Sequence, residues 1–242
     1  MSSSSGSDAR AFSFGKSRDT VGIMRISFQV SINKVVKFLI ASDVALSAGW
    51  GFIAPIFAIL ITEQIEGGNA AVAGFAVGMY WVVKSVVQPF LAKYLDGNHG
   101  EIDDFYFLVG GLFVSGLIPL GYLFITLPWQ LYALEFIHAI AMACVIPTWS
   151  GIFTRHIDKG KEAFDWSIDS TALGFGAGIA GMLGGILVEA FGFEVVFLLV
   201  SAFSMLSVVI LFPIRPLIVP KGKPLARPAM KKPPFSHEKG AF

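Results

Sequence analysis

All but one of the 18 Lys and Arg residues fall on one side of six strongly hydrophobic segments. Basic residues accumulate in the short loops on the cytoplasmic side of a membrane, so this asymmetry predicts one orientation with both termini cytoplasmic. The opposite connections, residues 63–70, 127–129 and 191–194, contain no Lys or Arg. The bias argues against copies that insert both ways up and predicts a multi-pass protein of the inner or plasma membrane.

Each hydrophobic segment is long enough to cross the bilayer as a helix. About 20 apolar residues span the ~30 Å hydrocarbon core, and backbone polar groups in lipid must bond within their own segment. The composition agrees, since 55% of the residues are hydrophobic and 14% are charged. The sequence predicts an all-α membrane protein with six transmembrane helices, at residues 38–62, 71–91, 105–126, 130–153, 170–190 and 195–214.

A six-helix domain at residues 34–214 is flanked by two polar tails. Residues 1–33 are expected to be a disordered cytoplasmic tail, since residues 1–20 are Ser-rich and polar. Residues 215–242 are basic and Pro-rich, which favours anchoring of the topology and attraction to anionic lipid. No cleavable signal peptide is expected, and either Met1 or Met24 could be the start.

The end of the second span carries a recognisable loop motif. Residues 88–100 read Gln-Pro-Phe-Leu-Ala-Lys-Tyr-Leu-Asp-Gly-Asn-His-Gly. This segment resembles the loop motif of the major facilitator superfamily, which reads roughly Gly-x-x-x-Asp-Arg-x-Gly-Arg-Arg. Asp96 matches the Asp of the motif and Ala92 replaces its first Gly. The basic residues of the motif are missing, and acidic residues stand in their place: Glu101, Asp103 and Asp104.

Two later features extend the resemblance over residues 34–214. Arg155 ends the fourth span, where the family often carries an Arg, and the fifth span is Gly-rich, as is typical of the family. Members usually have twelve helices in two six-helix halves, so the resemblance implies one half of a major-facilitator-type transporter fold. A second copy would supply the other half, and the common orientation requires a parallel homodimer with a two-fold axis along the membrane normal.

The fifth span offers a surface for that pairing. Small residues four apart let helices approach closely in lipid, and this span presents Gly174, Gly178, Gly181 and Gly185. The resemblance implies that Asp96 lies near the positive N-terminal end of the partner's fifth span, held by Arg155 of its own subunit. We predict that Asp96 and Arg155 form a gating latch; the alternative is that both are ordinary interfacial charges.

Ionisable groups inside spans are costly and usually mark a pathway or a pair. Asp43 and Lys84 lie about 9 and 11 Å from the cytoplasmic edge at ~1.5 Å per residue, which predicts an ion pair. That pair is either structural or part of a substrate or ion path; snorkelling of Lys84 alone is the third alternative. Glu135 and His138, three apart on one face of the fourth span, form either a proton or cation site or a contact with headgroups and a neighbouring helix.

Prolines and tryptophans occur near the middle of the first and fourth spans. Pro55 and Pro147 are expected to kink their helices, and Trp50 and Trp149 are candidate walls of a binding site through cation–π or apolar contact. Bent helices that pack without a ligand remain the alternative.

Enzyme functions find no support in the motifs. The chain lacks a His-Glu-x-x-His zinc motif and a Gly-x-x-x-x-Gly-Lys phosphate loop, so we expect no enzyme, no metal, no cofactor and no nucleic-acid partner. The sequence predicts a secondary transporter that works by alternating access on a small amphiphilic or cationic solute, with proton coupling as a further expectation. The alternatives are a non-transporting scaffold or accessory subunit, and a half-transporter that pairs with a different half-length chain.

Overall fold

A computed structural model describes residues 32–97 and 100–218, and no strand occurs within these ranges. Six helical segments are long and apolar enough to cross a membrane, which confirms the predicted all-α, six-span architecture. Predictions for residues 1–31 and 219–242 lie outside the described residues. In chain order the elements are α1 (Lys34–Ile53), the 3-10 helix η1 (Ala54–Ile56), α2 (Phe57–Gln64), α3 (Ala70–Gly97), α4 (Ile102–Tyr122), α5 (Pro128–His156), α6 (Glu162–Phe191), α7 (Phe193–Leu211) and the 3-10 helix η2 (Phe212–Leu217).

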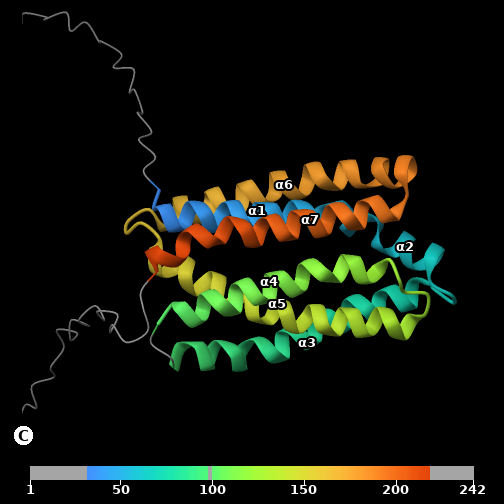
Figure 1. Cartoon of the computed structure of the whole chain (residues 1–242), viewed down its shortest axis with the longest axis horizontal. Coiled ribbons are helices and arrows are strands. Elements are labelled where there is room, and N and C mark those ends of the chain that lie inside the picture. The colour runs from blue at the N-terminus through green and yellow to red at the C-terminus, as the bar shows by residue number, and fades with distance from the viewer. Residues whose placement is uncertain (1–31, 98–99, 219–242) are drawn as a thin grey trace, which may run out of the picture. The chain divides into compact units, whose positions relative to one another are not determined.

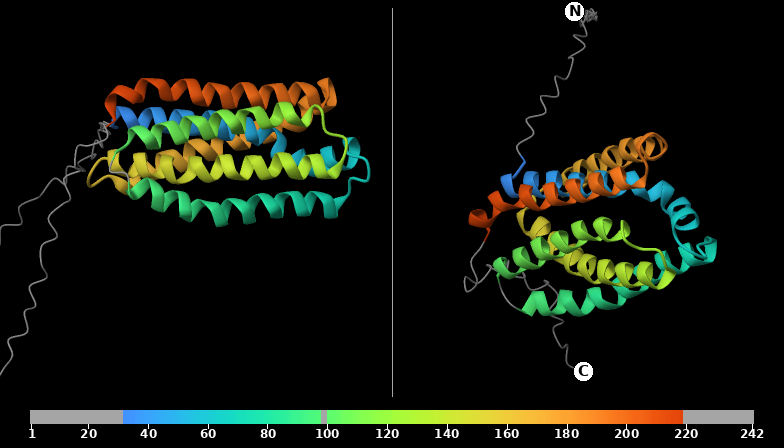
Figure 2. Two further views of the ribbon diagram at one scale, coloured as in Figure 1. Left: turned by 60° about the horizontal axis from the view of Figure 1, so that its bottom comes forward. Right: turned by 45° about the vertical axis from the view of Figure 1, so that its right-hand side comes forward.

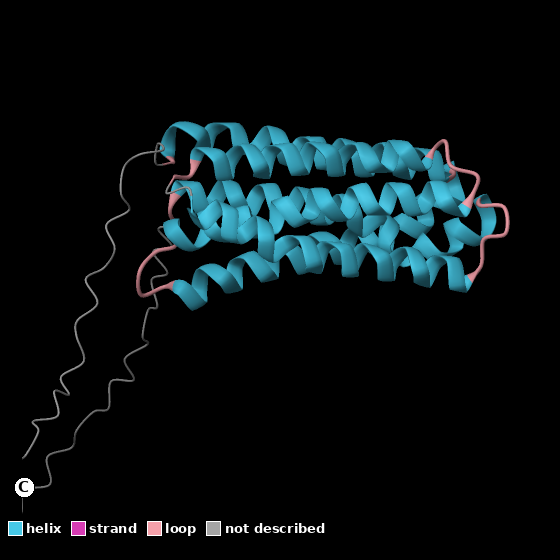
Figure 3. Ribbon diagram, turned by 90° about the horizontal axis from the view of Figure 1, so that it is seen from below, coloured by secondary structure: helices cyan, strands magenta, loops and turns pink. Residues whose placement is uncertain are grey.

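The helices pack against one another in the order α6, α1, α7, α4, α5, α3. Figure 1 shows α6, α1 and α7 in one layer and α4, α5 and α3 in the other, and the right-hand view of Figure 2 shows the same two layers. The connecting loops lie at the two ends of the bundle (Figure 3). We call the end where α1 begins and α7 finishes the terminal end, and the opposite one the far end. Because of this packing order, α3 and α6 each have a packed neighbour on one side only.

Pro55 interrupts the first span. Proline lacks a backbone N–H and clashes with the preceding turn, so α1 ends at Ile53, a 3-10 turn follows, and the helix resumes at Phe57. The interruption expected at Pro55 is therefore present. At Pro147, α5 continues as one helix, and the kink predicted there stays a prediction.

All six spans differ from their predicted bounds, and α6 and α4 show why. α6 begins at Glu162, well before the predicted start at Ser170, because its first two turns are helical but polar. α4 ends at Tyr122 rather than at Thr126, where the side chain of Gln130 accepts a hydrogen bond from the Thr126 N–H. Hydropathy marks the apolar part of a helix, and its true ends depend on local capping.

Two hydrophobic cores hold the helices together, one toward each end of the bundle. The core at the terminal end includes Leu39, Phe105, Ile152, Phe153 and Leu211. The core at the far end includes Ile56, Leu60, Tyr122, Leu131 and Phe197. Hydroxyls also join α1 to α7, where the Ser42 hydroxyl lies 2.8 Å from that of Ser207.

The helices α3 and α6 contribute little to either core. Few of their residues are buried, whereas about half of those in the first, third and fourth spans are. Their exposed apolar side chains must be covered by lipid or by a partner. They include Phe75, Val82 and Phe90 on α3, and Phe175, Met182 and Ile186 on α6.

Candidate functional site

A cavity of about 590 Å³ lies between α1 and α3, with α5 as its third wall. Apolar and aromatic side chains make up most of the lining, and a few charged or polar groups stand among them. The lining includes Asp43, Ser47, Trp50, Tyr80, Trp81, Glu135, His138, Met142 and Leu173. A mostly apolar cavity with a few converging polar groups is the usual form of a small-molecule site.

Glu135 and His138 face this cavity from one side of α5, and both are buried. The Tyr122 hydroxyl at the end of α4 donates a hydrogen bond to Oε1 of Glu135. The other carboxyl oxygen, Oε2, lies 3.7 Å from Nδ1 of His138, which has no hydrogen-bond partner among the described residues. The carboxyl is thus fixed on one side and has a titratable neighbour on the other, an arrangement that can hold a proton beside the cavity.

Aromatic rings surround His138. The Trp50 ring of α1 stacks on the imidazole with centroids 4.2 Å apart, and the Tyr80 ring of α3 lies 4.8 Å away. Trp50 therefore lines the cavity, and its indole Nε1 is buried without a hydrogen-bond partner among the described residues. These contacts bring α1, α3 and α5 together around one imidazole.

Lys84 does not pair with Asp43, so the prediction of that ion pair is wrong. Its ammonium nitrogen lies 3.5 Å from the centroid of the Trp81 ring and 5.0 Å from that of Tyr80. The two helices α1 and α3 line different walls of the cavity and are not adjacent in the packing order. Equal depth in the membrane was not enough, because the packing order separates the two helices.

Asp43 has an acidic neighbour in place of the predicted Lys84. It lies close enough to Asp169 of α6 for the two carboxyls to interact electrostatically. Asp169 is buried, and its Oδ1 has no hydrogen-bond partner among the described residues. Two carboxyls therefore stand near the terminal-end side of the cavity. Asp169 was not among the predicted site residues, since it precedes the predicted start of its span.

Trp149 does not line the cavity, contrary to the prediction. It is buried in the core at the terminal end, stacks on Phe153 at 4.7 Å, and donates a 3.4 Å hydrogen bond from Nε1 to the Leu39 carbonyl oxygen. Trp149 shares its helix face with His138. His138 lines the cavity and Trp149 does not, because α1 and α5 meet at the depth of Leu39 and leave no space between them there.

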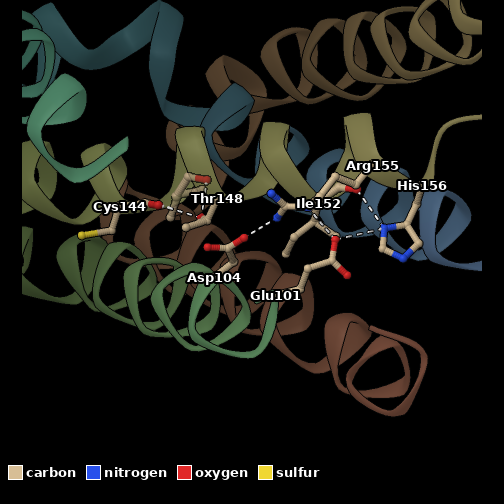
Figure 4. Close-up of polar contacts among 8 residues, drawn as sticks. Glu101, Asp104, Cys144, Thr148, Ile152, Arg155 and His156 are labelled. Carbon is tan, nitrogen blue, oxygen red and sulfur yellow. Dashed lines mark hydrogen bonds and ion pairs between the residues drawn. The ribbon is translucent and has the colours of Figure 1, made fainter. Parts of the chain in front are cut away.

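Arg155 binds two acidic residues at the terminal end, as Figure 4 shows. Its Nε lies 2.6 Å from Oε1 of Glu101, and its terminal nitrogen donates to Oδ2 of Asp104. Both carboxylates are buried, and Nδ1 of His156 lies 3.6 Å from Glu101. The cluster joins the end of α5 to the start of α4.

Asp96 is therefore not the partner of Arg155, and that part of the latch prediction is wrong. Asp96 is exposed near the end of α3, while Arg155 turns to the acidic residues that replace the basic ones of the loop motif. An excess of carboxylates beside a single Arg was the signal that could have predicted this pairing. The predicted contact of Asp96 with a partner's helix remains a prediction.

The glycines of α6 divide into two groups. A side chain added at Gly174, Gly178 or Gly185 would meet nothing within 4 Å, so these three positions face open space. Gly181 faces α1, where a Cβ would lie 3.6 Å from the Gly51 carbonyl oxygen. The tightest contact belongs to Gly184, which the sequence analysis did not name: a Cβ there would lie 2.0 Å from the carbonyl oxygen of Phe52.

The family follows from a comparison with known sequence families. The model of the Major Facilitator Superfamily matches residues 39–239. This chain belongs to the major facilitator superfamily. The match extends over all six membrane-spanning segments and agrees with the helix packing described above.

Individual relatives are distant. The chain is 21% identical over 192 residues to the multidrug resistance protein MdtG of Escherichia fergusonii, covering 79% of this chain and 47% of that protein. It is 24% identical over 164 residues to MdtG of Citrobacter koseri, covering 68% of this chain and 40% of that protein. The chain thus spans about half the length, or less, of these curated relatives.

A solved structure shows the same fold. The POT family transporter PepTSo aligns with a TM-score of 0.61 at 16% sequence identity, over 80% of this chain and 40% of that chain. This chain thus shares its helix arrangement with part of that transporter structure.

Proposed function

We propose that this protein is a secondary transporter that moves a small amphiphilic or cationic solute by alternating access, as a parallel homodimer. The observation that carries the proposal is the cavity between α1, α3 and α5, which holds the Glu135–His138 pair and is flanked by two sparsely packed helices. Membership of a transporter superfamily and likeness to a transporter fold support it.

The chemistry of the cavity favours cations. Asp43 and Glu135 line it, Asp169 lies beside Asp43, and aromatic rings offer faces that attract positive charge. Lys84 illustrates the last point, because its ammonium already rests on the rings of Trp81 and Tyr80. An organic cation with an apolar body would find both partners here.

Proton coupling would use Glu135. Its carboxyl touches the hydroxyl of Tyr122 and lies beside the imidazole of His138, so a proton and a bound cation would compete for one buried group. Such competition couples the entry of one cation to the departure of the other, since a ligand shifts an equilibrium by its differential affinity for the two states.

A second copy would cover the exposed faces of α3 and α6. Both helices present large apolar side chains, and Gly174 and Gly178 on α6 leave room for a close helix approach. Basic residues gather in the segments at the terminal end, so we propose that this end faces the cytoplasm in both copies. A dimer of this kind would place two cavities around one axis.

The test is transport in proteoliposomes that contain the purified full chain. We expect a fluorescent organic cation to accumulate when a proton gradient is imposed, and Glu135→Gln to abolish the response to the gradient. Glu189→Gln is the matched control, because Glu189 is exposed near the far end of α6 and outside the cavity. Equal loss in both variants, or gradient-driven uptake that survives Glu135→Gln, would contradict the assignment.

A further inference from the structure

A second hollow lies on the outer surface of the bundle, between α4 and α5. It is a groove of about 390 Å³ on the side of α5 opposite to the cavity, since the α5 residues that line it lie about half a helical turn away from Glu135 and His138. Almost all of its lining is apolar. The lining consists of Tyr106, Phe107, Gly110, Gly111 and Val114 of α4, and Phe136, Ile137, Ile140, Ala141 and Cys144 of α5.

Two adjacent glycines shape this groove in different ways. Gly111 lets the helices approach, because a Cβ there would lie 2.6 Å from the Ala141 carbonyl oxygen. Gly110 faces outward, and a Cβ there would meet nothing within 4 Å. Tyr106, Gly110 and Val114 follow one another at intervals of four, so they form one face that runs about 12 Å along the helix at ~1.5 Å per residue.

A cationic group stands at the terminal end of the groove. The Arg215 guanidinium donates a 2.9 Å hydrogen bond to the hydroxyl of Tyr106, and its carbon lies 5.8 Å from the centre of that ring. Arg215 is exposed and belongs to none of the ion pairs among the described residues. Tyr106 thus connects the apolar groove to a positive charge near the end of a membrane-spanning helix.

Two of the three carboxylates near this end of α4 are bound by Arg155. Glu101 and Asp104 point toward Arg155 and bind it (Figure 4). Arg215 is also the first of seven basic residues in the sequence between positions 215 and 242. Asp103, three residues before Tyr106 on α4, also lies at this end. The positive group in contact with the groove is Arg215, whose guanidinium complements a phosphate.

We infer that the groove between α4 and α5 is a binding site for an anionic phospholipid of the bilayer, with an acyl chain along Gly110 and the phosphate on Arg215. An apolar channel parallel to the helices fits a lipid chain, and a guanidinium at its end fits a phosphate oxygen through charge-assisted hydrogen bonds. Basic residues beside a membrane-spanning helix attract anionic lipid by this same electrostatic contribution. The site is separate from the transport cavity and does not depend on the proposed transport.

The headgroup contact is tested by native mass spectrometry of the full chain in detergent, titrated with phosphatidylglycerol or phosphatidylcholine. We expect the wild type to retain phosphatidylglycerol preferentially, and Arg215→Gln to weaken that retention about fivefold, the effect of one basic residue near an anionic surface. Lys93→Gln is the matched control, an exposed basic residue close to the end of α3. Unchanged retention in Arg215→Gln, or the same loss in Lys93→Gln, would overturn the site.

The contact with the lipid acyl chain is tested by Gly110→Leu, which fills the groove without meeting other atoms of the protein at its Cβ. We expect this variant to lose retention of both lipids, whereas Gly74→Leu, an equally open glycine on α3, retains both. Far-UV circular dichroism checks that each variant keeps its helices. Glycerol phosphate, which carries the charge without a chain, should not bind; its binding, or full lipid retention by Gly110→Leu, would refute a seated lipid chain.

Discussion

Removing the hydroxyl of Tyr122 isolates the hydrogen bond that fixes Glu135. Tyr122 is 1% exposed, and its ring packs against Phe57 and Phe197. Tyr122→Phe keeps those ring contacts and deletes the O–H that donates to Glu135. Hydrogen bonds between membrane helices average about 0.6 kcal/mol and reach about 1.7, whereas bonds to charged groups in soluble proteins contribute about 1.5–3. For a buried carboxyl acceptor we expect a loss of about 1–1.7 kcal/mol in the free energy of unfolding.

The assay is reversible unfolding in mixed micelles, followed by tryptophan fluorescence for wild type, Tyr122→Phe, Glu135→Gln and the double variant. A double-mutant cycle isolates the interaction between the two side chains. Tyr132→Phe is the matched control, since Tyr132 also contacts another ring but has no hydroxyl hydrogen bond among the described residues. A coupling energy below about 0.3 kcal/mol, within the additivity of independent sites, would refute the bond and with it the fixed position of Glu135.

Three further predictions concern helix packing and the terminal end. Gly184→Ala should lower the free energy of unfolding by about 1–3 kcal/mol or more, because the added methyl group overpacks against the Phe52 carbonyl. Gly178→Ala should leave the free energy of unfolding unchanged or raise it by up to about 1 kcal/mol. Equal effects of the two substitutions would contradict the packing of α6 on α1. Arg155→Gln should cost about 2–4 kcal/mol, between the values for exposed and buried ion pairs, and a loss under 0.5 kcal/mol in chemical unfolding would contradict the cluster. Asp96→Asn should slow transport without impairing membrane insertion, and an unchanged rate in proteoliposomes would remove Asp96 from gating.

Hydropathy was sufficient to predict the six membrane-spanning helices. Six apolar runs determine six helices because lipid leaves the backbone no other way to satisfy its polar groups. Glu135 and His138 could be placed together, since spacing along one helix fixes which residues share a face. Pro55 could be placed at a helix break for a similar local reason, the loss of a backbone donor.

Contacts between helices were harder to predict, because sequence gives the depth of a residue but not the direction in which its helix faces a neighbour. Asp43 and Lys84 have similar depths, yet Asp43 lines the cavity from α1 while the ammonium of Lys84 rests on the Trp81 ring of α3. Trp149 has the correct helix face but lies where α1 and α5 converge. The partners of Arg155 were set by the position of the start of α4, which brings Glu101 and Asp104 to it rather than Asp96.

Pairing of two copies is the central claim, because the cavity between α1, α3 and α5 of one copy needs a second unit to enclose a solute. Native mass spectrometry of the full chain, expressed alone and embedded in nanodiscs, tests it most directly. We predict a complex with the mass of two 26.1 kDa chains, reduced to single chains by Gly178→Leu on the open face of α6. A wild-type protein that remains a single chain in the nanodisc would contradict the self-completed transporter.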